Sequence, residues 1–278
     1  MHVALKILTT SALFTWVGLA LAHGPLDEQI ANKTREIRQN PNRADLYLER
    51  GELHRHHEDW PAAMADYDTA AALDPELHVV DLARGKLMLD AGWYDRALPP
   101  LNRFLRRYPD NGDARLTRAR VLVQLKRHLE AVLDFDAAIA LLPRITPALF
   151  LERARALAAA DRLEEALRSV DEGVKSLGGV VTLQLYAIEL EVQLERYDAA
   201  LERLGVLAAR SARQEKWLMR RGEILLKAGR LSEARAALEQ AREAVDALPT
   251  RLRDRKATRK LAARIDQALM QLNDETER

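Results

Sequence analysis

The sequence predicts an all-α protein built as a solenoid of helical repeats. More than half of its 278 residues are Ala, Glu, Lys, Leu or Arg, and aromatic residues make up only 5%. This composition is typical of helical repeats, because the β-branched and aromatic residues that suit strands are scarce. A spacing of 34 residues recurs along most of the chain. Each repeat contains two stretches with the apolar spacing of an amphipathic helix.

Residues 1–22 are expected to be a signal peptide. Lys6 precedes an apolar stretch that runs from Ile7 to Ala22 and ends in the small-x-small sequence Ala20-Leu21-Ala22. This stretch is shorter than the ~20 residues that a membrane-spanning helix needs. Cleavage would leave His23 as the first residue of an exported chain, most simply a periplasmic one, with no stable membrane span.

Charge and cysteine content exclude several classes of function. The leader contains one base and no acid, so the remaining chain has equal numbers of basic and acidic residues. A net charge near zero argues against general affinity for nucleic acid or anionic membranes. The absence of cysteine excludes disulfides, thiolate zinc sites, iron–sulfur clusters and a cysteine nucleophile.

Residues 23–43 are expected to form an N-terminal capping helix, from Pro25 to Gln39. Leu26, Ile30 and Ile37 would form its inner side. A cap is needed because the end of a solenoid otherwise exposes an apolar face.

Six helix-turn-helix units are expected over residues 44–248. Their spacing is clearest in the sequence pairs Arg50-Gly51, Arg84-Gly85 and Arg118-Ala119, and one additional residue near Thr146 shifts the frame. We call the first helix of each unit helix A and the second helix B, and we number positions from the first residue of the unit. The expected units are 44–77, 78–111, 112–145, 147–180, 181–214 and 215–248.

Charged residues at positions 7 and 23 are predicted to join helix A to helix B as structural ion pairs. The predicted pairs are Arg50 with Asp66 and Arg118 with Asp134. In the second unit Pro99-Pro100 replaces the acid, so Arg84 is expected to lack this partner. Because two N–H donors are missing there, the first turn of that helix B is expected to be loose or displaced.

Residues 249–278 are expected to form a basic C-terminal capping helix and tail, with the helix running from Pro249 to about Asn273. Its apolar stripe consists of Leu252, Leu261, Ile265, Leu269 and Leu272. Its first part has Asp254 as the only acid among seven bases, which are Arg251, Arg253, Arg255, Lys256, Arg259, Lys260 and Arg264. A solvated helix face is the expected role, and an acidic partner or a lipid headgroup is the alternative.

The repeat resembles the tetratricopeptide repeat family. Position 8 is small in five of the six units, position 20 is Ala in all six, and position 24 is aromatic or aliphatic. Arg at position 7 in five units departs from the family pattern, and the fourth and fifth units match it least. The resemblance implies a right-handed superhelix that binds a peptide or protein segment in a concave groove, without catalysis.

The resemblance also implies that positions 5 and 9 of helix A face the groove. The expected partner-binding residues are Leu48, Leu82, Lys86, Leu116, Arg120, Leu151, Arg155, Leu185 and Met219. They would offer apolar contacts beside charges that are basic in the middle of the array. Packing between neighbouring A helices is the alternative role for the position 5 side chains. Some family members clamp a terminal carboxylate with Lys and Asn at positions 2, 5, 6 and 9 of helix A. In the first three units these positions include Leu48, Glu52, Ala83, Asp113 and Thr117, so the clamp is absent and a terminal carboxylate is not the expected ligand.

The sequence contains no phosphate-binding loop, zinc-protease motif or serine-hydrolase motif. We therefore expect neither catalysis nor a cofactor. Metal handling is the alternative function. The amine and imidazole of a mature N-terminal His23 could chelate copper, and His54 and His57 could share one helix face. Against the second site, His54 occupies a position that faces the core.

Overall fold

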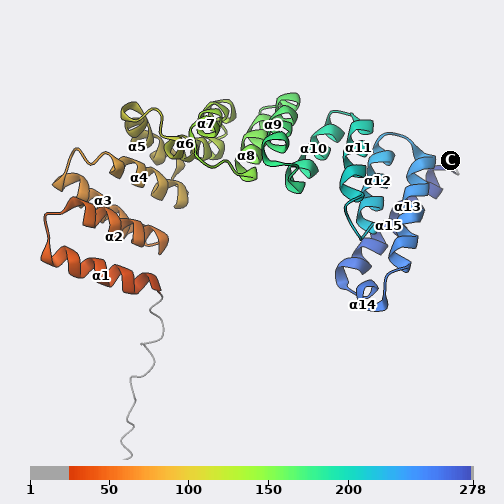
Figure 1. Cartoon of the computed structure of the whole chain (residues 1–278), viewed down its shortest axis with the longest axis horizontal. Helices are drawn as coiled ribbons and strands as arrows, with labels where there is room; N and C mark the ends of the chain where they lie inside the picture. The colour runs from red at the N-terminus through yellow and green to blue at the C-terminus, as the bar shows by residue number, and fades with distance from the viewer. Residues whose placement is uncertain (1–24, 277–278) are drawn as a thin grey trace, which may run out of the picture. The chain divides into compact units, whose positions relative to one another are not determined.

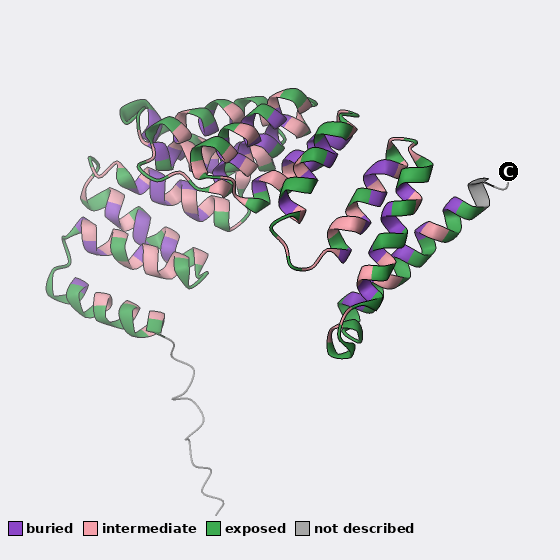
Figure 2. Ribbon diagram, turned by 45° about the vertical axis from the view of Figure 1, so that its right-hand side comes forward, coloured by how far each residue is buried: buried purple, intermediate pink, exposed green. Residues whose placement is uncertain are grey.

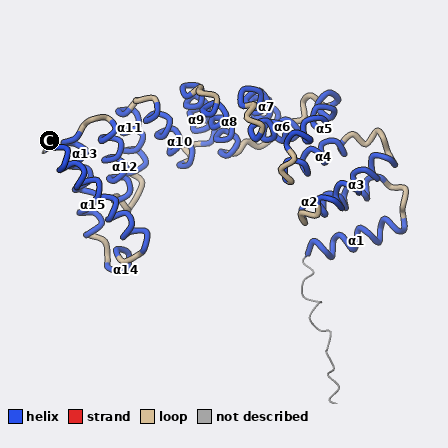
Figure 3. Tube along the Cα trace, turned by 180° about the vertical axis from the view of Figure 1, so that it is seen from behind, coloured by secondary structure: helices blue, strands red, loops and turns tan. Residues whose placement is uncertain are grey.

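The computed structural model describes residues 25–276, so the expected signal peptide and His23 lie outside the described residues. Within residues 25–276 the chain forms helices joined by turns and loops, without a strand (Figure 3). Every helix in this part of the chain is too short or too polar to span a bilayer. The fold is an all-α solenoid of helical repeats, as the sequence predicts.

The helices form two compact units that divide after Arg107 (Figure 1). The first contains α1 (Pro25–Gln39), α2 (Ala44–His56), α3 (Trp60–Leu73), α4 (Val79–Asp90) and α5 (Tyr94–Arg107). The second contains α6 (Gly112–Gln124), α7 (His128–Leu141), α8 (Pro147–Ala159), α9 (Leu163–Leu177), α10 (Val181–Gln193), α11 (Tyr197–Ala208), α12 (Glu215–Lys227), α13 (Leu231–Asp246), α14 (Thr250–Arg253) and α15 (Lys256–Thr276). Each consecutive pair from α2–α3 to α12–α13 lies within one of the 34-residue ranges expected from the sequence.

The turn between helix A and helix B has one backbone conformation in all six repeats. In the third repeat the Lys126 N–H donates to Val123 O at 3.0 Å, and the Arg127 N–H donates to Leu122 O at 2.9 Å. This is the Schellman arrangement that satisfies the last carbonyls of a helix. Position 15 has a positive φ in each repeat, at Glu58, Gly92, Lys126, Asp161, Glu195 and Gly229.

Close packing between helix A and helix B depends on the small residue at position 8. A Cβ added at Gly51 would lie 2.5 Å from Cε1 of Tyr67, and one at Gly222 would lie 2.7 Å from Cδ2 of Leu238. Tyr67 and Leu238 are fully buried. Buried residues therefore line the contact between the paired helices, as the purple segments of Figure 2 show.

Both predicted ion pairs between helix A and helix B are confirmed. Arg50 donates to the two carboxylate oxygens of Asp66 at 2.8 and 2.7 Å. Arg118 donates in the same way to Asp134 at 2.6 and 2.8 Å. Both carboxylates are buried, and the bidentate geometry offsets the cost of removing them from water.

The second repeat differs from prediction in two respects. Arg84 has an acidic partner after all, because its Nη2 donates to Asp68 of the preceding repeat at 2.6 Å. The first turn of α5 is regular, since the Ala97 N–H donates to Trp93 O at 3.1 Å. Pro99 and Pro100 follow this turn inside the helix and remove the N–H groups that would otherwise bond the carbonyls of Asp95 and Arg96.

The chain ends also depart partly from expectation. In α1, Ile37 is buried, and Thr34 accepts a hydrogen bond from Arg50 of α2 at 3.0 Å. The predicted final helix is instead two helices, α14 and α15, separated at Asp254 and Arg255. No Gly or Pro marks this break, so sequence signals for helix ends did not predict it. The longer helix, α15, buries Ile265 and Leu272.

Candidate functional site

Three ion pairs of one kind cross from one repeat to the next. In these pairs, a carboxylate at position 25 of one repeat binds an arginine at position 7 or 23 of the following repeat. The pairs are Arg84 with Asp68, Arg153 with Asp136 and Arg203 with Asp171, at 2.6, 3.0 and 3.0 Å.

The junction between α11 and α12 lacks such a pair. Gly205 occupies the position of the acid, and a Cβ added there would have no atom within 4 Å. Arg221, at position 7 of the next repeat, is exposed and forms no ion pair with another described residue. The connecting loop spans residues 209–214. A different ion pair, between Arg230 of the sixth repeat and Asp198 of the fifth at 2.7 Å, crosses this junction. A pocket of about 460 Å³ opens beside it.

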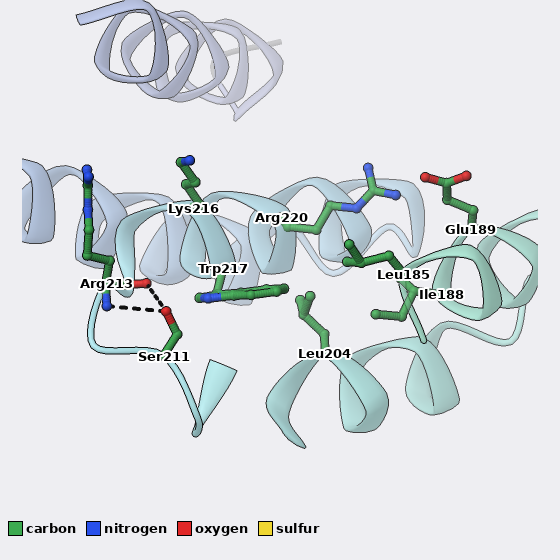
Figure 4. Close-up of a pocket in the computed structure, with 9 residues that line it drawn as sticks. All are labelled: Leu185, Ile188, Glu189, Leu204, Ser211, Arg213, Lys216, Trp217 and Arg220. Atoms are coloured by element: carbon green, nitrogen blue, oxygen red, sulfur yellow. Dashed lines mark hydrogen bonds between the residues drawn. The ribbon is translucent and has the colours of Figure 1, made fainter. Parts of the chain in front are cut away.

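The pocket is lined by residues from α10, α11, α12 and the loop before α12 (Figure 4). They are Leu185, Ile188 and Glu189 of α10, Leu204 of α11, Ser211 and Arg213 of the loop, and Lys216, Trp217 and Arg220 of α12. Lys216 and Arg220 extend above the Trp217 ring in the view of Figure 4, and Leu204 lies below it.

Apolar side chains form the inner part of the pocket. Ile188 and Leu204 are almost completely buried, Trp217 is half-buried, and Leu185 is 39% exposed. A pocket with a partly exposed tryptophan above buried aliphatic groups suits one apolar side chain of a partner, because such anchors carry much of the binding energy at protein interfaces.

Three basic side chains and one acid surround this apolar part. Arg213 is held by Glu215, to which its Nε donates at 2.6 Å. Arg220 lies 3.5 Å from a carboxylate oxygen of Glu223. Lys216 is exposed and makes no hydrogen bond or ion pair through its side chain within the described chain. An ammonium group therefore stands beside the tryptophan, available to a carboxylate of a bound segment.

Tyr186 adjoins the pocket on α10. The Arg155 guanidinium lies 5.7 Å from the centre of its ring. Burial raises the pKa of the Tyr186 phenol, Arg155 lowers it and Glu189 raises it, with burial the largest effect. The phenol therefore stays protonated near neutral pH.

The structure places the predicted position 5 residues in different environments. Leu82 and Met219 are buried, whereas Leu48, Leu116 and Leu151 are half-buried. Leu185 lines the pocket described above. The burial of Leu82 and Met219 therefore fits the alternative role named for position 5, which is packing between neighbouring A helices.

The predicted basic residues at position 9 are partly occupied by the chain itself. Arg120 donates to both carboxylate oxygens of Glu152, at 2.8 and 2.9 Å. Arg155 is exposed and lies over Tyr186, and Lys86 is partly exposed. The structure does not bring any of the three into the pocket. The basic groups that it does place there are Arg213, Lys216 and Arg220.

A second pocket of about 500 Å³ lies between α1 and α2 and includes Leu48. Lys33 in its wall lies 2.7 Å from Glu36 and 2.6 Å from Glu49. Hydrogen bonds to these two carboxylates raise the pKa of Lys33. Since the charges of this pocket are compensated within the chain, the pocket of α10–α12 is the stronger candidate for a ligand.

Sequence analysis missed Lys216, Trp217 and Arg220. They stand at positions 2, 3 and 6 of the sixth repeat, whereas the predicted groove residues stand at positions 5 and 9. Trp217 is one of only four tryptophans in the chain, which was an available signal. The pocket itself, in contrast, combines residues of two repeats, which the pattern of a single repeat does not bring together.

The histidines considered for metal binding have separate acidic neighbours. His57 Nε2 lies 3.1 Å from Asp27 of α1, so it joins the capping helix to α2. His54 lies between Asp59 and Asp66, at 3.9 and 4.0 Å. Among the described residues, no group of three or more His, Cys, Asp or Glu side chains is arranged to hold a metal ion.

Comparison with known families identifies the repeat. The tetratricopeptide repeat family matches residues 34–78, 82–148 and 187–249, and the chain therefore belongs to that family. The matches leave out 149–186, which contains most of the fourth repeat and the start of the fifth. These are the two repeats that depart furthest from the family pattern in the sequence.

Similar solved structures agree with the fold. A tetratricopeptide repeat protein from Parabacteroides merdae is 16% identical, with 88% of this chain and 92% of that chain covered, at a TM-score of 0.53. The C-terminal part of a repeat-containing protein from Cytophaga hutchinsonii is 14% identical, with coverages of 81% and 95% and a TM-score of 0.62. Such low identities show the fold alone. A search of curated proteins found no match.

Proposed function

We propose that the protein is a non-catalytic scaffold that binds a segment of a partner protein, and that it works in the periplasm after removal of residues 1–22. The tetratricopeptide repeat fold suggests a protein-interaction role. The observation that carries the proposal is the pocket of α10–α12, in which Trp217 lies beside the unpaired ammonium group of Lys216. A segment with an apolar side chain next to an acidic one suits this arrangement.

Peptide display tests the proposal without knowledge of the partner. A library of random peptides is selected on the purified protein, and affinities of the selected peptides are measured by fluorescence polarisation. We expect an aromatic or aliphatic residue beside Asp or Glu. Trp217→Ala should weaken binding by ~2–4 kcal/mol if the tryptophan is the central anchor. Lys216→Glu should weaken it at least ~10-fold, because a charge repulsion replaces an attraction.

Lys227→Glu is the matched control, because it makes the same change at an exposed lysine near the other end of α12. It should change affinity less than about twofold, since an exposed charge this far along the helix is largely screened. Circular dichroism should show equal helix content in all variants. Peptides that bind Trp217→Ala and Lys216→Glu as tightly as the wild type would place the binding surface elsewhere.

A further inference from the structure

We propose that the exposed basic surface at the start of the C-terminal helices binds the phosphate headgroups of an anionic lipid membrane. Five residues form this surface, which we call the basic patch: Arg251, Arg255, Lys256, Arg259 and Lys260. All five are exposed, and none of their side chains makes a hydrogen bond or ion pair with the described chain. The inference does not depend on the pocket of α10–α12.

Several other cations in this part of the molecule have partners within the chain. Arg242 lies 2.6 Å from Asp246 and 2.8 Å from Asp266, and Arg264 pairs with Glu223. Arg253, between two members of the basic patch, donates to the Asp246 carbonyl at 3.1 Å. The patch is therefore a local concentration of positive charge on a chain in which, outside the leader, basic and acidic residues are equal in number overall.

The position of the patch on α15 adds to its unbalanced charge. The first turn of α15 contains no acid, whereas the first turn of α9 contains Glu164 and Glu165. The amino end of a helix carries a partial positive charge, which favours acids and disfavours bases there. Lys256 and Arg259 thus lie where the helix itself repels them, and an external anion relieves this repulsion.

Phosphate headgroups suit these side chains better than a peptide does. Arginine binds phosphate through two parallel N–H donors, and three of the five residues are arginines. The apolar residues beside them are small or half-buried, as at Ala257 and Leu252, so the patch offers no anchor for an apolar side chain. A membrane presents many phosphates at once, which makes up for the weak attraction of each exposed pair.

The basic and acidic residues outside the leader are equal in number, which argues against long-range attraction to any polyanion, whether nucleic acid or membrane. A charged patch on a neutral protein acts within about one Debye length, ~8–10 Å at physiological salt. Adsorption to a nearby anionic surface is what such a short-range patch favours.

Vesicle sedimentation tests the proposal. Protein recovered from cells, with its amino terminus determined by intact mass, is mixed with vesicles of equal parts phosphatidylglycerol and phosphatidylcholine, or of phosphatidylcholine alone. We expect binding to the anionic vesicles only, with loss of binding at high salt. The triple variant Arg255→Gln, Arg259→Gln, Lys260→Gln should bind the anionic vesicles ~100-fold more weakly than the wild type, because each cation removed weakens binding about fivefold.

The matched control is Arg168→Gln, Lys175→Gln, Lys227→Gln. These three cations are exposed, and none forms an ion pair with another described residue. The control removes the same net charge from separate places and should keep at least half of the binding. Equal binding by the patch variant and the wild type overturns the proposal, and so does equal loss in the control.

Competition separates the membrane from other polyanions. A glutamate-rich peptide and a DNA duplex are added at the same ionic strength, each in amounts that match the exposed lipid charge. Retention of the protein on the vesicles supports the membrane proposal. The proposal is overturned if one competitor displaces the protein from the vesicles and also binds the wild type directly but not the patch variant. The patch is then assigned to that competitor.

Discussion

At the scale of single residues, the turn between helix A and helix B is strained in four repeats. Position 15 has a φ of 62° at Glu58, 61° at Lys126, 60° at Asp161 and 58° at Glu195. Residues with a Cβ are disfavoured in this left-handed region by ~1–2 kcal/mol. The Schellman hydrogen bonds hold these residues there, because without them the last carbonyls of helix A would lose their partners.

Lys126→Gly should therefore stabilise the protein by ~0.5–1 kcal/mol, measured from urea unfolding followed by circular dichroism. Relief of the left-handed strain favours the variant, and the greater freedom of glycine in the unfolded chain opposes it. Lys126→Ala is the control, since it removes the exposed side chain and keeps the Cβ. If alanine stabilises as much as glycine, the long side chain and not the backbone is the source of the effect.

At the scale of elements, the fit of a helix pair depends on position 8 and position 24 together. Gly222 lies against the fully buried Leu238. In the third repeat the same positions are Ala119 and Phe135. A methyl group at position 8 is therefore accommodated when the side chain at position 24 is a different one. A larger, branched group at Gly222 would have to displace Leu238 or separate α12 from α13.

Gly222→Val is expected to destabilise the α12–α13 pair by ~1–3 kcal/mol through overpacking. Hydrogen exchange should accelerate in α12, α13 and their neighbours and stay unchanged in α2 and α3, because each repeat of a solenoid contacts only adjacent repeats. Gly205→Val makes the same change where a Cβ meets open space, so it should be neutral or slightly stabilising. Uniform acceleration along the chain would show that the repeats unfold together.

At the scale of the whole molecule, the two compact units carry different candidate surfaces. The first has a pocket whose charges are paired within the chain, as at Lys33. The second has the pocket with Trp217 and, at the C-terminal end of the chain, the basic patch. We propose that the second unit makes the contacts with partner and membrane, since Lys216 and the basic patch lack acidic partners within the described chain.

Export of the whole molecule is tested by its mass. A signal peptidase that recognises Ala20-Leu21-Ala22 should leave a chain that begins at His23. The intact mass of protein from the periplasmic fraction should therefore lack residues 1–22. An Ala22→Arg substitution is expected to slow cleavage and leave the full-length chain attached to the membrane. A periplasmic protein that keeps residues 1–22 contradicts the proposal of cleavage.

The sequence alone determined the repeat, because local rules govern it. The small residue at position 8, Ala at position 20 and the apolar spacing of each helix follow from contacts within about 34 residues. The same locality explains why the pairs Arg50 with Asp66 and Arg118 with Asp134 could be predicted. Their partners stand at equivalent places in each repeat, and antiparallel helices bring those places together.

Tertiary structure decided the features that depend on contacts between repeats. Arg84 has a partner because Asp68 of the preceding repeat reaches it, and the pocket of α10–α12 combines side chains of the fifth and sixth repeats. The same geometry buries Leu82 and Met219 and leaves Leu185 accessible. A repeat pattern assigns equivalent residues the same role, whereas their exposure depends on how each repeat packs against the next.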